Sequence, residues 1–129
     1  MRVYLCGGIH ALSDAEAQGW RERAKALLAS HVTVLDPMLR VRREVSDSEL
    51  HSFISEDLRE IAESDALIVN ATRPSWGTAM EIVYARVLQR RIVAFIDPRE
   101  KSVSPWLRYH CEIHPSLEEA VTSLMNPTT

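Results

Sequence analysis

The segment Ser75–Glu81, which reads Ser-Trp-Gly-Thr-Ala-Met-Glu, places an acidic side chain early in a predicted helix. This helix follows a buried strand predicted at Ala66–Ala71, and α/β folds bind ligands at that edge of a parallel sheet. Glu81 shares one helical stripe with Tyr84 and Leu88, so its carboxylate is expected on the packed face. Burying a carboxylate is costly, which makes Glu81 a candidate for chemistry. The alternative interpretation is a solvated glutamate at the edge of the stripe.

A second carboxylate interrupts the apolar face of the preceding predicted helix. That face is formed by Leu50, Phe53, Ile54, Leu58 and Ile61. Position 57 lies on the same face, seven residues after Leu50 and four before Ile61, yet it holds Asp57. An aspartate here either bonds a neighbouring backbone amide or is a second acid facing the same cleft as Glu81.

Two carboxylates in one cleft suit the cleavage of N-glycosidic or O-glycosidic bonds. One attacks the anomeric carbon, and the other handles a proton at the leaving group or at water. A low dielectric and the like charge raise the pKa of at least one carboxyl group, which creates a proton donor. Because a helix N-terminus favours the ionised form of the nearest carboxylate, we expect Glu81 to be the anionic nucleophile.

The loop Gly7-Gly8-Ile9-His10 follows the first predicted strand. The absence of Cβ atoms at the two glycines allows backbone N–H groups to approach a phosphate or sugar, although a plain strand-ending turn has the same sequence. No GxGxxG and no Gly-Lys-Ser/Thr motif is present, which disfavours dinucleotide enzymes and P-loop NTPases. We expect His10 and His110 to be surface or polar-packing side chains and predict no metal site.

Composition narrows the function classes further. A chain of 129 residues with 46% hydrophobic and 26% charged residues is expected to form one globular domain over 1–129. A net charge of −3 does not indicate the basic surface that nucleic-acid binding requires. The basic cluster Arg40, Arg42 and Arg43 precedes acidic residues and is interpreted as a solvated loop, with a phosphate or substrate contact as the alternative.

Cysteine usage and hydropathy bear on the compartment. Cys6 and Cys111 fall in separate predicted strands without metal-binding spacing, so free thiols in a reducing compartment are expected. The sequence has no apolar run long enough to span a membrane and no signal-peptide pattern at its start. We therefore expect a cytoplasmic protein without a membrane partner.

Strands and helices are predicted to alternate along the chain. Strands are expected at Arg2–Cys6, Val32–Leu35, Ala66–Ala71, Arg91–Ile96 and Tyr109–Ile113. Capping boxes beginning at Ser13 and Ser46, and a similar signal at Ser116, start the intervening and terminal helices. Such alternation predicts an α/β fold, specifically a flavodoxin-like or Rossmann-like three-layer sandwich around a five-stranded parallel sheet. In a 2-1-3-4-5 strand order, the Gly7-Gly8 loop and the loop before Glu81 meet at the switch point.

Four motifs occur in the order found in the nucleoside 2-deoxyribosyltransferase superfamily. They are Tyr4–Ile9 (Tyr-Leu-Cys-Gly-Gly-Ile), Glu56–Leu58 (Glu-Asp-Leu), Ser64–Ala66 (Ser-Asp-Ala) and Ser75–Ile82 (Ser-Trp-Gly-Thr-Ala-Met-Glu-Ile). The chain resembles this superfamily from Tyr4 to about Trp106. Its members include transferases that exchange bases on deoxynucleosides and N-glycosidases that hydrolyse nucleoside 5'-monophosphates.

The resemblance implies roles for particular residues. Glu81 is similar to the nucleophile that forms a glycosyl–enzyme ester, Asp57 to the carboxylate that assists the base, and Tyr4 to the hydroxyl that orients the nucleophile. Substrate contacts are implied for Gly7, Gly8, Ile9, His10, Ser75, Gly77, Ser104 and Trp106. The resemblance implies no cofactor, a nucleotide or nucleoside as the small-molecule partner, and a homodimer in which Ser104 and Trp106 reach the neighbouring site.

Two positions favour the hydrolase branch of the superfamily. Ser75 stands where the transferases carry an acid, and Ser104 where they carry an asparagine; both serines resemble phosphate-binding serines of the hydrolases. His10-Ala11 stands where similar hydrolases carry Arg-Gly. We therefore expect an enzyme that hydrolyses a (deoxy)nucleoside 5'-monophosphate. A deoxyribosyltransferase and a non-catalytic nucleotide sensor remain the alternatives.

Overall fold

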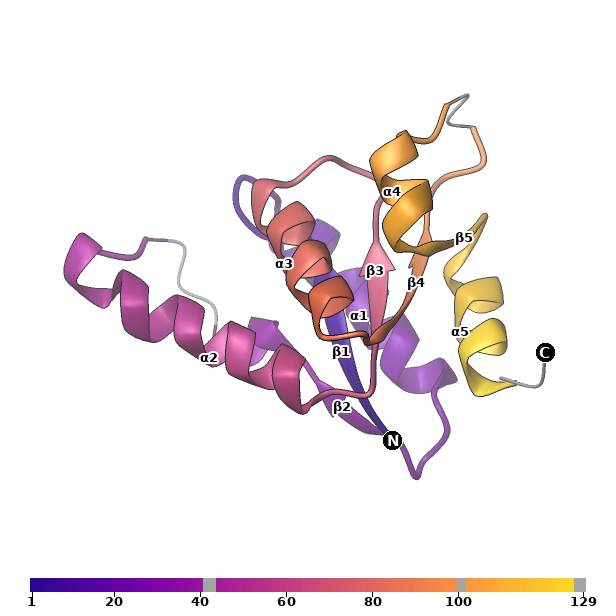
Figure 1. Cartoon of the computed structure of the whole chain (residues 1–129), viewed down its shortest axis with the longest axis horizontal. Helices are drawn as coiled ribbons and strands as arrows, with labels where there is room; N and C mark the ends of the chain where they lie inside the picture. The colour runs from indigo at the N-terminus through magenta and orange to yellow at the C-terminus, as the bar shows by residue number, and fades with distance from the viewer. Residues whose placement is uncertain (41–43, 100–101, 127–129) are drawn as a thin grey trace.

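A parallel sheet with the strand order β2-β1-β3-β4-β5 forms the centre of the computed structural model, which describes residues 1–40, 44–99 and 102–126 (Figure 1). The strands are β1 (Arg2–Gly7), β2 (Thr33–Leu35), β3 (Ala66–Asn70), β4 (Arg91–Phe95) and β5 (Glu112–His114). Each neighbouring pair is parallel, with register partners such as Tyr4 and Leu67. The predicted α/β fold, its parallel sheet and its strand order are confirmed.

Helices cover both faces of the sheet. They are α1 (Asp14–Leu27), α2 (Leu50–Glu63), α3 (Trp76–Val87), α4 (Pro105–His110) and α5 (Leu117–Met125), with 3-10 turns η1 (Pro37–Arg40) and η2 (Asp47–Glu49) before α2. One core cluster lies between the sheet and helices α1 and α5, and a second lies on the other face under α2, α3 and α4. The N-terminal end of α2 extends away from the body of the molecule (Figure 1).

Alternation along β1 divides its side chains between the two cores. Val3 and Leu5 pack in the α1 and α5 core, whereas Tyr4 and Cys6 point to the α2 and α3 side. The strand ends at Gly7, where an added Cβ would lie 2.8 Å from the Trp20 ring. Glycine is thus required at this position for the loop to leave the sheet close to α1.

Local sequence signals account for most helix starts. Ser13 forms the expected capping box with Glu16, and the Ser116 hydroxyl accepts the N–H of Glu119. The capping box expected at Ser46 is wrong, because its hydroxyl bonds the Glu49 carboxylate instead of a backbone N–H. The 3-10 turn η2 occupies Asp47–Glu49, and α2 begins only at Leu50.

The predicted strand at Tyr109–Ile113 is also wrong in its bounds. Ser104 caps α4 and Pro105 occupies the first turn, so the chain remains helical through His110. Cys111 follows the helix and donates its N–H to the Leu107 carbonyl, so it does not belong to a strand. Strand β5 therefore occupies Glu112–His114.

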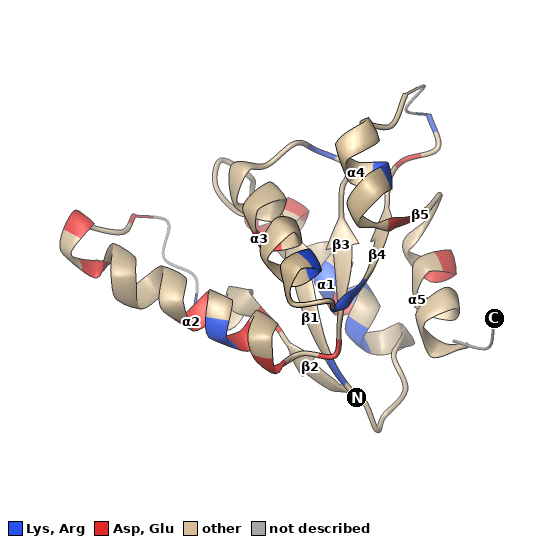
Figure 2. Ribbon diagram, in the orientation of Figure 1, with Lys and Arg blue, Asp and Glu red and all other residues tan. Residues whose placement is uncertain are grey.

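Charged residues are distributed over the helices and not gathered on one element. Figure 2 shows acidic and basic positions next to each other along α2, where Arg59 pairs with Glu56 and Glu63. Exposed pairs of this kind contribute little to stability. Among the described residues, no helix combines the length and apolar character that a membrane span requires.

Candidate active site

Glu81 lies on α3 with its carboxylate turned toward β1. The Tyr4 hydroxyl donates a hydrogen bond to Oε2 of Glu81 at 2.6 Å, and the Cys6 thiol donates to Oε1 at 3.4 Å. Both donors are fully buried and come from alternate positions of one strand. The expected contact of Tyr4 with Glu81 is therefore present, and Cys6 is an additional partner that the sequence analysis missed.

A cavity of about 480 Å³ opens at the C-terminal end of β1, beside this hydrogen-bonded cluster. Expected site residues that line it are Tyr4, Gly7, Ile9, His10, Asp57, Ser75, Gly77 and Glu81. The loop after β1 and the start of α3 thus meet as the strand order predicts. Pro37, Phe53 and Met80 contribute apolar wall that the sequence analysis did not assign.

Three expected residues lie outside the lining of this cavity. Gly8 packs against Ser75, whose Oγ lies 3.8 Å from a Cβ built on the glycine. Ser104 and Trp106 line a different cavity of about 710 Å³ between α3 and α4. Ser75 lines both cavities, so it stands at the boundary between them.

Both serines assigned to substrate binding also cap helices. The Ser75 hydroxyl accepts the N–H of Thr78 at 3.3 Å, and the Ser104 hydroxyl accepts the N–H of Trp106 at 3.1 Å. An N-cap serine retains its own O–H as a donor, so each can still bond an anion. His110 bonds the Trp106 carbonyl through Nδ1 at 2.7 Å, which is polar packing within α4.

Asp57 lines the cavity from α2, and its partner is Arg40. The guanidinium Nη2 lies 2.7 Å from Oδ1 of Asp57, which corrects the interpretation of a backbone-bonded aspartate. It also corrects the expectation that Arg40 is solvated, since only 28% of its side chain is exposed. Arg42 and Arg43 of the basic cluster lie outside the described residues.

The two carboxyl groups differ in their electrostatic environments. Burial, with a smaller contribution from the nearby Asp57, raises the pKa of Glu81 to about 7 against the hydrogen bonds from Tyr4 and Cys6. Burial also raises the pKa of Asp57, opposed by the hydrogen bond and charge of Arg40. Glu81 lies in the second turn of α3, beyond the strongest effect of the helix dipole. Burial therefore opposes the effect of the helix terminus on Glu81, and its role as the anionic nucleophile stays a prediction.

The donors beside Glu81 keep their protons. Burial, followed by the charge of Glu81, raises the pKa of the Tyr4 phenol far above its ordinary value, and the same two causes raise the pKa of the Cys6 thiol. Neither group ionises at physiological pH. Each therefore acts as a neutral donor that holds one oxygen of the carboxyl group.

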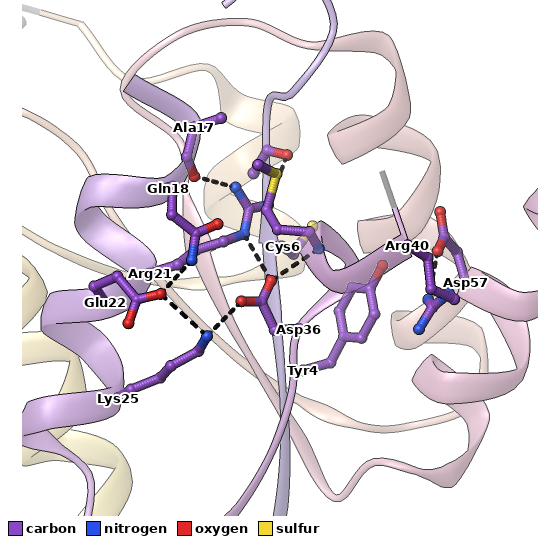
Figure 3. A network of polar contacts seen from close by, with 12 residues as sticks. Tyr4, Cys6, Ala17, Gln18, Arg21, Glu22, Lys25, Asp36, Arg40 and Asp57 are labelled. Carbon is purple, nitrogen blue, oxygen red and sulfur yellow. Dashed lines mark hydrogen bonds and ion pairs between the residues drawn. The ribbon is translucent and has the colours of Figure 1, made fainter. Parts of the chain in front are cut away.

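A buried ion network anchors the loop that begins at Gly7. Arg21 of α1 is fully buried, donates from Nη2 to the Gly7 carbonyl at 3.1 Å, and pairs through Nε with Asp36 at 3.5 Å. Lys25 contacts the other Asp36 oxygen at 2.7 Å. Figure 3 shows this network joining α1 to the segment after β2. Position 21 lies on the apolar stripe between Ala17 and Ala24. Arg21 is therefore a charged residue on an apolar helix face, which is the same sequence signal that indicates Asp57.

Replacing Glu81 by glutamine should remove a pH-dependent loss of stability. The folded protein holds the Glu81 proton up to about pH 7, whereas an unfolded glutamate releases it near its ordinary pKa of 4.5. This stabilisation is complete below pH 4.5 and is lost as the pH rises through 7, at a cost of about 3 kcal/mol. Urea unfolding at pH 5 and pH 8 should show a smaller drop for Glu81→Gln than for the wild type.

The exposed Glu22 offers a matched control, because its side chain is 60% exposed on α1. Glu22→Gln should retain the wild-type difference between the two pH values. An equal drop in Glu81→Gln and in the wild type would contradict the proposed protonation of Glu81.

Comparisons with known proteins identify the family of this chain. A protein of Thermofilum pendens with the provisional name 2'-deoxynucleoside 5'-phosphate N-hydrolase 1 is 27% identical over 96% of this chain and 92% of its own length. The 5-hydroxymethyl-dUMP N-hydrolase of Tetraodon nigroviridis is 31% identical over 76% of this chain and 71% of its own. The solved CMP N-glycosidase of Clostridium botulinum has the same fold, with a TM-score of 0.63 at 20% identity, covering 97% of this chain and 99% of that one. The model of the nucleoside 2-deoxyribosyltransferase family matches residues 3–125, and this chain therefore belongs to that family.

Proposed function

We propose that this protein hydrolyses the N-glycosidic bond of a (deoxy)nucleoside 5'-monophosphate, releasing the base and a (deoxy)ribose 5-phosphate. The observation that carries the proposal is the Tyr4–Glu81 hydrogen bond at the wall of a cavity that Asp57 also lines. A non-catalytic nucleotide sensor would gain nothing from two carboxylates whose burial costs stability. Family membership and the names of the two relatives support the same class of chemistry.

The reaction follows from the positions of the two acids. Ionised Glu81 attacks the anomeric carbon of the sugar and forms an ester, while the bond to the base breaks. The departing base takes its proton from the Asp57 carboxyl group. Water then attacks the anomeric carbon of the ester and gives a proton to Asp57, which releases Glu81 and leaves the acid pair with one proton, as before the reaction. Tyr4 holds Oε2 throughout both steps.

Two hydroxyls favour a 5'-phosphate over a free 5'-hydroxyl. Ser75 lies at the N-terminus of α3, where backbone N–H groups and the helix dipole favour an anion, and it lines the cavity that contains Glu81. Ser104 is proposed to supply a second hydroxyl from a neighbouring subunit. A transferase acting on free deoxynucleosides is the alternative, in which an acceptor base replaces water.

The 5'-phosphate preference is testable with paired substrates. Each 5'-monophosphate of a panel containing dCMP, CMP, dUMP and 5-hydroxymethyl-dUMP would be compared with its nucleoside, with and without an acceptor base. Charge-assisted hydrogen bonds contribute about 1.5–3 kcal/mol each. They predict that kcat/KM for the preferred 5'-monophosphate exceeds that for its nucleoside by about two orders of magnitude. Ser75→Ala should erode this preference by raising KM.

Ser116→Ala is the matched control for the loss of a helix cap, since Ser116 caps α5 in the same way. Both variants should lose about 1 kcal/mol of stability, but only Ser75→Ala should change KM. The hydrolase assignment fails if free deoxynucleosides with an acceptor base react as fast as the monophosphates are cleaved.

A homodimer is part of the proposal, and an exposed apolar surface supports it. Trp76, Met80, Val83 and Val87 are exposed along one face of α3, and Trp106 and Tyr109 are exposed on α4. Contiguous exposed apolar side chains of this size mark interaction surfaces. We propose that Ser104 and Trp106 reach the neighbouring site across this surface. A reducing, cytoplasmic setting is proposed from the two free cysteines.

Mixed dimers test whether Ser104 acts in the neighbouring site. A dimer of one Glu81→Ala chain and one Ser104→Ala chain should keep one intact site and half of the wild-type kcat with the wild-type KM. The reason is that one site would combine Glu81 of the Ser104→Ala chain with Ser104 of the Glu81→Ala chain. A raised KM in the purified mixed dimer would instead assign Ser104 to the site of its own chain.

A further inference from the structure

Arg40 bridges two carboxylates on one face of α2. Its Nη2 lies 2.7 Å from Oδ1 of Asp57, and its Nη1 lies 2.7 Å from Oε1 of Glu60. Asp57 and Glu60 are three residues apart and therefore neighbours on the helix surface. The three side chains are 28%, 18% and 15% exposed for Arg40, Asp57 and Glu60, so the contact is more shielded than an ordinary surface pair.

Arg40 reaches the cavity only through Asp57. Asp57 lines the cavity, but Arg40 is not among the residues that line it. The guanidinium comes from the end of η1, whose first residue, Pro37, is part of the cavity wall. The contact through which Arg40 can act on the cavity wall is therefore its ion pair with Asp57.

The charged and titratable groups around Asp57 act on its protonation in opposite directions. Arg40 from η1 favours the carboxylate, whereas Glu56 and Glu60 from α2 and Glu81 from α3 carry or can carry like charge. Tyr4 from β1 is a neutral donor that is already bonded to Glu81. Among the described residues, Arg40 is the cation that acts on Asp57, and it stays charged because arginine does not deprotonate in proteins.

We propose that Arg40 is a positioning residue for Asp57: it fixes the aspartate at the cavity wall and keeps it ionised until substrate binds. This inference rests on the proposed function, in which Asp57 must carry a proton when the base departs. Burial raises the pKa of Glu81 to about 7, so below that pH the Glu81 carboxyl of the free protein holds a proton. Substrate binding moves one proton from the Glu81 carboxyl to the Asp57 carboxylate, so the pair keeps its net charge and Glu81 becomes the nucleophile.

The raised pKa of Glu81, about 7, is consistent with this order of protonation. The order also gives a reason for the arginine. An ionised Asp57 next to a neutral Glu81 avoids two adjacent negative charges in the empty cavity, while the guanidinium prevents Asp57 from taking the proton first. Loss of Arg40 should then shift the proton toward Asp57 even without substrate.

Carbon-13 NMR of the aspartate and glutamate carboxyl carbons in the free protein measures the protonation of Asp57 and Glu81 directly. The variants Asp57→Asn and Glu81→Gln assign the two resonances. Arg40→Gln should raise the titration midpoint of Asp57 by about one pH unit or more and lower that of Glu81. Arg40→Lys, which keeps the charge, should leave the Asp57 midpoint near the wild-type value. Glu60→Gln removes an anion from the same cluster and should lower the titration midpoint of Asp57.

An unchanged Asp57 midpoint in a folded Arg40→Gln protein would overturn the inference. If Arg40→Gln does not fold, the titration midpoint of Asp57 in Glu60→Gln is the test. A rise of that midpoint would also overturn the inference. Because these titrations need no substrate, they are independent of the proposed function. The absence of turnover with every nucleotide would disprove that function while leaving the effect of Arg40 on Asp57 measurable.

Discussion

The burial of one carboxyl group, that of Glu81, determines most of what the surrounding structure must supply. A carboxylate removed from water loses several kcal/mol of solvation unless donors replace the lost hydrogen bonds. Here Tyr4 and Cys6 provide one donor for each oxygen, from alternate positions of β1. The pairing therefore depends on the contact between the central strand and α3, and any shift of one residue in the strand would turn both donors to the opposite core.

Unequal donors leave the two oxygens of Glu81 with different reactivity. The phenol at 2.6 Å is a strong donor to Oε2, whereas the thiol at 3.4 Å is a weak one to Oε1. The Arg21–Asp36–Lys25 network then fixes the Gly7 carbonyl, and with it the loop that closes the same cavity. A buried ion pair adds little net stability compared with apolar packing, whereas Arg21 bonds the Gly7 carbonyl directly.

The sequence alone predicts the layers, the parallel sheet, the strand order and the meeting of the β1 loop with α3, since these depend on periodicity and on the rules of chain crossover. It also predicts Asp57 as an anomaly, because a charge on an apolar stripe is visible in one dimension. The same test applies to Arg21. Arg40 could not be found this way, because it pairs with Asp57 across 17 residues through a non-local contact.

The remaining differences arise where local signals compete. Ser104 and Pro105 start a helix in a segment whose Tyr109–Ile113 portion favours a strand, and the helix extends to His110. The pKa of Glu81 depends on a similar competition. The helix terminus favours the carboxylate, whereas burial favours the protonated acid, and the depth of burial is set only when α3 packs on the sheet.

The most direct test of the account is the chemical fate of Glu81 during turnover. Acid quenching of the protein in the steady state with its best 5'-monophosphate, followed by peptide mapping by mass spectrometry, should find a sugar-phosphate ester on the peptide that contains Glu81. Glu81→Gln should form no such adduct and release no base. Rapid base release by the wild type with the sugar phosphate attached to another residue, or base release by Glu81→Gln at the wild-type rate, would contradict the central role of this carboxylate.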